Sequence, residues 1–279
     1  MTWRSMSWRI SACPARGGGL FDRLSELEST LGEGGTGGAV TIAAEDAPQL
    51  YLLPNVVQQF TRDNPRVRLR LMSWPPDQIM ELVRENEADL GVIAERPLTP
   101  GLVFHPWQVF SAYVLIPIGH PLVRRGIPSL DDLLNEATVA RYPLVIAESQ
   151  DTRGRLAQAL ESQGLPLNLA FEVGTIEAVK RYVSMGLGIG VVSGICLTGA
   201  DSERLVMIPV PPELGGLTTY GVVLREGKHI SRALSALLPL VRAASLERLD
   251  QPEQTAKMQQ RQPKASSRET ISSDRAGPG

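Results

Sequence analysis

Short apolar segments alternate with amphipathic helical patterns along most of this sequence, and no other feature restricts its fold as strongly. Segments such as Leu90–Ala94 are almost wholly apolar, as buried parallel strands are. Between them, apolar residues recur every three or four positions, the period of a helix with one buried face. The series begins at Val40–Ala44 and starts afresh at Tyr113–Ile118. Two successive β-α-β-α-β sets predict an α/β fold of two lobes, each a mostly parallel sheet flanked by helices.

Composition and pattern together predict the domain organisation. Residues 38–111 together with 219–249 form the first predicted lobe, and residues 112–218 form the second. Residues 250–279 are rich in Gln, Ser, Lys, Arg and Pro. Such a tail buries too little apolar surface to offset its ordering entropy, so it is predicted to be disordered. Residues 1–37 are predicted to be mostly irregular.

One helical pattern precedes the first lobe, at residues 20–31. Its leucines are spaced by four, three and four positions, at Leu20, Leu24, Leu27 and Leu31. This spacing is typical of a short amphipathic or coiled-coil helix. Two interpretations stay open: an ordinary helix packed on its own domain, and the remnant of a dimerising linker helix.

Charge and cysteine content narrow the class of function. The 28 Lys and Arg residues nearly balance the 30 Asp and Glu residues, for a net charge of −2. The chain as a whole therefore lacks the basic footprint of a nucleic-acid or membrane-surface binder. Cys13 and Cys196 belong to no Cys-x-x-Cys pair, and no apolar run reaches membrane-spanning length. Because the N-terminus also lacks a secretory pattern, we expect a cytoplasmic protein.

Motifs of enzymes and cofactor sites are missing from the sequence. It contains no Gly-x-Ser-x-Gly, no P-loop and no His-Glu-x-x-His, so we expect no enzyme, no metal and no cofactor. His105 and His120 each precede a proline, which predicts turn or surface positions. The run Gly186-Leu-Gly-Ile-Gly190 follows a helical pattern and precedes an apolar one, the reverse of the dinucleotide-binding order. It predicts a helix C-cap at Gly186 and close packing of strand glycines at Gly188 and Gly190.

Polar residues gather where predicted strands end and helices begin. We expect a ligand to contact Glu45, Asp46, Gln49, Glu95, Ser149, Thr152 and Thr175. Helix N-termini present free N–H groups there. Ligands of open α/β sheets bind outside the carboxyl ends of the strands, which for two lobes predicts a cleft between them. The alternative is that Asp46, Asp151 and Thr175 merely cap their own helices.

Several stretches between residues 38 and 245 resemble the effector-binding domain of LysR-type transcriptional regulators. They include Gly38-Ala-Val-Thr-Ile-Ala43, Ala88-Asp-Leu-Gly-Val92, Gly119-His-Pro-Leu122 and Lys180-Arg-Tyr-Val-Ser-Met-Gly-Leu-Gly-Ile-Gly190. Leu50-Tyr-Leu-Leu-Pro54 is similar to the cysteine-regulon, or CysB-like, subgroup. The resemblance implies a two-lobed type 2 periplasmic-binding-protein fold and a small-molecule effector. It also implies a homodimer or homotetramer that binds DNA through a separate winged helix-turn-helix.

The sequence departs from that family in two places. Residues 1–19 do not resemble a helix-turn-helix, so we expect this chain to lack the DNA-reading head. In the first strand-to-helix turn, Glu45, Ala47 and Pro48 stand where the subgroup offers hydroxyl and amide groups to its effector. Because a carboxylate repels an anion, we expect an effector with amine or hydroxyl donors instead of bare sulfate. The main alternative function is a solute-binding protein of a transport system, which shares the fold but requires export.

Overall fold

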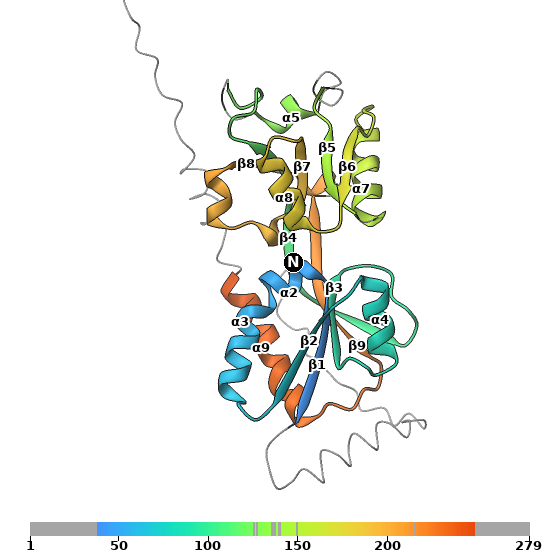
Figure 1. Cartoon of the computed structure of the whole chain (residues 1–279). Coiled ribbons are helices and arrows are strands. Elements are labelled where there is room, and N and C mark those ends of the chain that lie inside the picture. The colour runs from blue at the N-terminus through green and yellow to red at the C-terminus, as the bar shows by residue number, and fades with distance from the viewer. Residues whose placement is uncertain are drawn as a thin grey trace, which may run out of the picture. The chain divides into compact units, whose positions relative to one another are not determined.

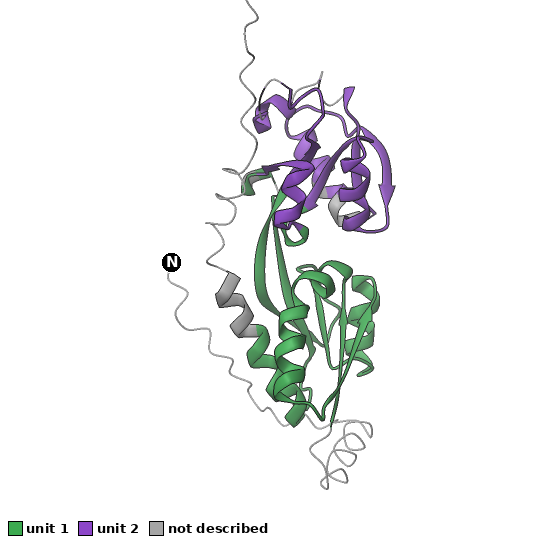
Figure 2. Cartoon of the chain, turned by 60° about the vertical axis from the view of Figure 1, so that its left-hand side comes forward, with its two compact units in different colours: residues 1–112, 193–196, 211–250 green, residues 113–192, 197–210, 251–279 purple. Residues whose placement is uncertain are grey.

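The computed structural model describes residues 38–124, 126, 128–134, 138, 141–148, 150–214 and 216–248 (Figure 1). The expected helix at 20–31 and the expected disordered tail at 250–279 lie outside the described residues. The described chain divides into two compact units (Figure 2). Unit 1 holds the described residues up to Ala112, the segment Ser193–Cys196 and the described residues from Pro211 onward, and unit 2 holds Tyr113–Val192 and Leu197–Val210.

The sheet of unit 1 is built around β1 (Ala39–Ala44), whose C-terminal half is fully buried. β1 pairs in parallel with β2 (Arg68–Ser73) on one side and with β3 (Leu90–Ala94) on the other. β9 (Leu217–Arg225) pairs antiparallel with β3 and with the first part of β4 (Leu102–Pro117), which gives the order β2-β1-β3-β9-β4. Because β1 and β3 are parallel neighbours, their carboxyl ends lie at one edge of the sheet.

Helices cover both faces of this sheet, as the alternation of patterns predicts. α3 (Leu53–Asp63) and α9 (Arg232–Arg248) pack together on one face, where their apolar residues share a core with Ile42. α4 (Pro76–Arg84) packs on the other face against Ala43. Figure 1 shows α3 beside α9, with α4 on the opposite side of the strands.

The local sequence of α3 shows how these elements form. Leu53, Val56 and Phe60 recur every three or four positions, and all three are buried in the core. Pro54 lies in the first turn, where its missing N–H would have no helical acceptor in any case. The helix ends shortly before Pro65, because a proline ring disfavours helical backbone in the residue before it.

Unit 2 repeats the arrangement around β5 (Leu144–Ala147). β5 pairs in parallel with β6 (Leu169–Val173) and with β7 (Ile189–Ser193). The second part of β4 pairs antiparallel with β8 (Leu205–Pro209), so the order is β8-β4-β7-β5-β6. Its helices are α5 (Leu130–Leu133), α7 (Gln150–Glu161), α8 (Ile176–Ser184) and the 3-10 helix η2 (Gly199–Glu203). No helix within the described ranges is long and apolar enough to cross a lipid bilayer.

β4 is longer than the sequence predicts, and its first half corrects one expectation. The strand begins at Leu102 and not at Tyr113, so His105 and Pro106 lie within a strand and not in a turn. The pairing register with β9 shifts between Pro106 and Gln108, and such a bulge accommodates a residue that has no N–H to donate. Partial burial lowers the pKa of His105, because desolvation disfavours the charged imidazolium.

The glycine run after α8 has the roles that its position in the sequence predicts. Gly186 directly follows the C-cap of α8 with φ +84°, and its amide N donates to the Val183 carbonyl O at 2.8 Å. A Cβ on Gly188, just before β7, would lie 2.7 Å from the Pro143 carbonyl O. A Cβ on Gly190 would lie 2.7 Å from Val183 Cγ2. Gly186 therefore ends the helix, Gly188 permits a close approach to the start of β5, and Gly190 permits α8 to pack closely on β7.

We predict that Gly190→Ala lowers the free energy of unfolding by about 1–3 kcal/mol, the usual effect of overpacking a filled core. The added methyl group would also lie 2.9 Å from Val179 Cγ1, and both valines are fully buried. Urea denaturation followed by circular dichroism measures the change. Gly119→Ala is the matched control, because a Cβ there meets no heavy atom within 4 Å. Equal stability of the two variants would contradict this packing.

Candidate functional site

Glu45 lies at the carboxyl ends of β1 and β3. It occupies the N-cap position of α2 (Asp46–Tyr51) with extended backbone, φ −63° and ψ 158°, but its side chain makes no capping hydrogen bond. Its Oε1 instead accepts a hydrogen bond from the backbone N of Ala94 at 2.8 Å. The backbone N of Glu45 donates to the Val92 carbonyl O at 3.1 Å. The carboxylate is therefore held at the strand edge where the sequence predicts the candidate site.

Asp46 and Gln49 follow on α2. Asp46 is exposed, and its Oδ1 accepts a hydrogen bond from the hydroxyl of Ser73 at the end of β2. Because Glu45 occupies the N-cap position, the alternative in which Asp46 caps the helix is wrong. Gln49 is half-buried, and within the described residues its buried Oε1 has no hydrogen-bond partner. A buried acceptor without a donor costs about 1–3 kcal/mol, so this oxygen is suited to a ligand N–H or O–H.

Glu95 and Arg96 lie at the end of β3. Glu95 is exposed, and its backbone N donates to the Thr219 carbonyl O at 2.7 Å. Arg96 forms an ion pair with Asp77, with 3.6 Å between Nη2 and Oδ1. The guanidinium therefore already has an acidic partner in unit 1. This edge of unit 1 combines several hydrogen-bond acceptors with negative charge.

Of the three site residues that the sequence predicts in unit 2, Thr175 is the one whose side chain the structure describes. Thr175 follows β6 as the N-cap of α8, and its hydroxyl O accepts a hydrogen bond from the Ala178 N at 3.2 Å. The capping interpretation of Thr175 is confirmed, and the hydroxyl keeps its own proton to donate. Ser149 lies outside the described residues, as do the side chains of Asp151 and Thr152.

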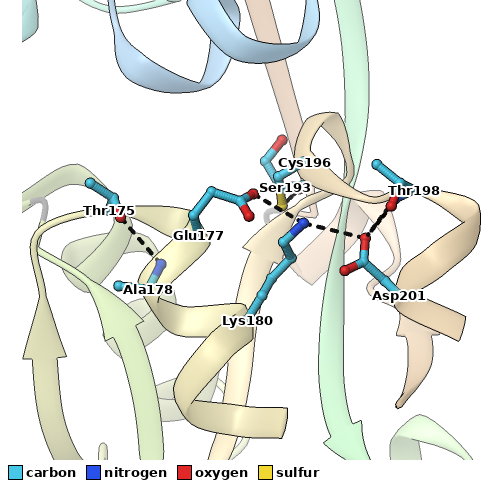
Figure 3. A network of polar contacts seen from close by, with 8 residues as sticks. All are labelled: Thr175, Glu177, Ala178, Lys180, Ser193, Cys196, Thr198 and Asp201. Atoms are coloured by element: carbon cyan, nitrogen blue, oxygen red, sulfur yellow. Dashed lines mark hydrogen bonds and ion pairs between the residues drawn. The ribbon is translucent and has the colours of Figure 1, made fainter. Parts of the chain in front are cut away.

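Lys180, on α8, is a buried charge that was not expected from the sequence. Its side chain is 9% exposed, and its Nζ lies 3.0 Å from Glu177 Oε1 and 3.3 Å from Asp201 Oδ2 (Figure 3). Asp201 also accepts hydrogen bonds from the N and the hydroxyl of Thr198, in the capping box of η2. The lysine therefore joins α8 to η2 inside unit 2. The available sequence signal was its spacing, because Lys180 lies four residues after Ile176 and three before Val183, on the apolar face of the helix.

His120 is a turn residue, as its sequence context predicts. Its Nδ1 accepts a hydrogen bond from the Leu122 N at 3.3 Å, and its ring packs edge-on against Tyr142 with 4.5 Å between centroids. Partial burial lowers the pKa of His120 by desolvation. In the part of the chain that the structure describes, no group of three or more His, Cys, Asp or Glu is placed to hold a metal ion.

The sequence of this chain is similar to that of known regulators. The family model of the LysR substrate binding domain matches residues 33–245. The HTH-type transcriptional regulator cbl of Escherichia coli (strain K12) is 31% identical over 175 residues, which cover 62% of this chain and 54% of the relative. The HTH-type transcriptional regulator SsuR of Burkholderia cenocepacia is 32% identical over 196 residues, which cover 69% and 61%. CysB of the same species is 29% identical over 206 residues, which cover 73% of this chain and 64% of the relative. The matched part of the chain therefore spans 54–64% of the length of these three relatives.

Solved structures share the fold. The cofactor-binding domain of the Cbl transcriptional regulator matches with a TM-score of 0.64 at 28% identity, over 77% of this chain and 93% of that structure. The BenM effector binding domain with its effector benzoate matches with a TM-score of 0.61 at 17% identity, over 75% and 93%, which shows the fold alone. The predicted type 2 periplasmic-binding-protein fold is thereby confirmed. Because the family model covers most of the sequence, this chain belongs to the LysR substrate-binding-domain family.

Proposed function

We propose that this chain is the effector-sensing part of a LysR-type transcriptional regulator. The match of residues 33–245 to the LysR substrate-binding model carries the proposal, and relatives named transcriptional regulators favour it over a transport protein. A domain of this non-enzymatic family implies a small-molecule effector. In the whole regulator, effector binding controls DNA contacts made by a helix-turn-helix. The resemblance to the CysB-like subgroup supports target genes of sulfur or related metabolism.

In this proposal, polar groups at the carboxyl ends of the strands contact the effector. They are Glu45, Asp46, Gln49 and Glu95 in unit 1 and Ser149, Thr152 and Thr175 in unit 2. The unit 1 group is supported by the buried Gln49 oxygen, which lacks a donor among the described residues. Thr175 retains a proton to donate after its oxygen accepts the cap hydrogen bond.

The charge of the unit 1 group favours one class of effector. At an effective dielectric constant of 20, one unit charge at about 4 Å from another contributes roughly 4 kcal/mol, more than a few neutral hydrogen bonds. Glu45 and Asp46 are adjacent carboxylates at one strand edge. Arg96 and Arg153, which could offset them, are paired with acidic side chains of their own units. We infer that the effector carries an amine or several hydroxyl donors and is not a bare sulfate.

We predict that amines, amino acids or polyhydroxylated compounds raise the melting temperature of this chain and that sulfate and thiosulfate do not. A ligand that binds the folded state alone stabilises it, by about 2.7 kcal/mol at a concentration 100 times its Kd. A thermal-shift screen of sulfate, thiosulfate, O-acetylserine, amino acids and polyamines measures the effect. Glu45→Gln removes the charge but keeps an oxygen that can accept from the Ala94 N. With this variant, a cationic ligand should produce the same rise in melting temperature only at a concentration at least tenfold higher. That factor corresponds to about 1.4 kcal/mol of binding free energy.

Glu87→Gln is the matched control for that screen. Glu87 is exposed and lies at the opposite, amino end of β3, so its loss should leave the response to every ligand unchanged. Stabilisation by sulfate at low concentration, retained in Glu45→Gln, would show that the proposed role of these carboxylates is wrong.

We further propose that the chain forms homodimers or homotetramers, as the resemblance implies. Leu71, on the outermost strand β2, is 38% exposed, and an apolar side chain at a sheet edge is suited to a contact between copies. Multi-angle light scattering at micromolar concentration should show a dimer or a larger species, and Leu71→Asp should shift it toward monomer. Leu217→Asp, at a comparably exposed position (43%) on β9, should not. A strict monomer of the unchanged chain would rule this assembly out.

A further inference from the structure

The outermost strand of unit 1 carries two arginines that the proposed effector site does not use. Among the described residues, β2 pairs with β1 alone and ends the strand order. Arg68 and Arg70 are exposed and alternate with Leu69, so their side chains point to the same face of the strand. Neither arginine forms an ion pair with another residue of the described ranges.

These arginines lie beside the point where the chain enters unit 1. In the parallel register of β1 and β2, Ala39 is the partner of Arg68 and Thr41 is the partner of Arg70. The backbone N of Arg68 also donates to the Gly38 carbonyl O at 2.8 Å. Gly38, where the described part of the chain begins, therefore lies next to the strand that carries the two basic side chains.

The segment that precedes Gly38 is acidic. Residues 24–37 contain Glu26, Glu28 and Glu33 and no lysine or arginine. Residues 34–37 separate Glu33 from Gly38, and a chain of that length spans at most about 17 Å. A tether this short gives the acidic segment an effective concentration on the order of millimolar at the two arginines. At that concentration, weak pairs of opposite charges are sufficient for association.

We propose that the acidic segment 24–33 docks on the face of β2 that carries Arg68 and Arg70 in the same chain. Charge complementarity and the short tether select this segment as the occupant, and the contact requires no effector. The alternative is that the two arginines only keep an exposed strand edge from pairing with other chains. That alternative predicts no energetic coupling between the arginines and the glutamates.

A charge-swap cycle on the full chain tests the docking. One variant combines Arg68→Glu with Arg70→Glu, the second combines Glu26→Lys, Glu28→Lys and Glu33→Lys, and the third carries all five changes. At low salt, each partial variant should melt about 2–4 °C below the unchanged chain. The complete swap should recover most of that loss, because opposite charges face each other again. In about 0.5 M NaCl the recovery should disappear, since exposed charges are screened.

Arg62→Glu is the control for the cycle. Arg62 is exposed in the last turn of α3, which covers the opposite face of the sheet, so this change should show no recovery with the lysine variant. If the fall in melting temperature of the complete swap equals the sum of the falls in the arginine variant and the glutamate variant, docking is overturned. A recovery that grows with protein concentration would assign the contact to a second copy of the chain and would equally overturn docking within one chain.

Discussion

Unit 1 is organised by the burial of β1 and β3, whose side chains are covered on both faces of the sheet. Ile42 packs with α3 and α9 on one face, and Ala43 packs with α4 on the other. A strand that is covered on both faces carries mostly apolar side chains along its length, so polar side chains concentrate at its ends. Because β1 and β3 are parallel, their carboxyl ends bring the turn before α2 and the turn after β3 to one edge. The effector contacts that we propose for unit 1 are concentrated there.

The hydrogen bond from the Ala94 N to Glu45 Oε1 gives that edge its electrostatic character. It holds the carboxylate of Glu45 in place next to Asp46 in the sequence, one helical turn before Gln49, whose amide oxygen has no donor among the described residues. An edge composed of acceptors binds donors and repels anions. The family therefore establishes the fold and an effector-binding domain, and we propose that the side chains of this edge select the effector.

The fold was largely predictable, because alternation and helical period are local signals that later packing did not override. The positions of the glycines after α8 were predictable for the same reason. The first half of β4 was not predictable from the sequence, because Pro106 locally indicates a turn. The strand forms there because it pairs with β9, which is distant in the sequence. The places of Glu45 and Glu95 directly after β1 and β3 were predictable from the same alternation, and their contact with an effector stays a prediction. Their partners, such as Ala94 for Glu45 and Asp201 for Lys180, come from other elements and needed the structure.

We propose that a donor-rich effector binds at the carboxyl ends of β1 and β3. Amide chemical shifts in a 15N-labelled chain, followed during separate titrations with a polyamine, an amino acid and sulfate, test it most directly. We expect saturable changes for one of the donor-bearing compounds, largest at the amides of Glu45, Gln49 and Glu95, and no such change for sulfate. Saturable changes for sulfate at these amides, or changes centred on the amino ends of the strands near Arg68 and Asp89, would contradict it.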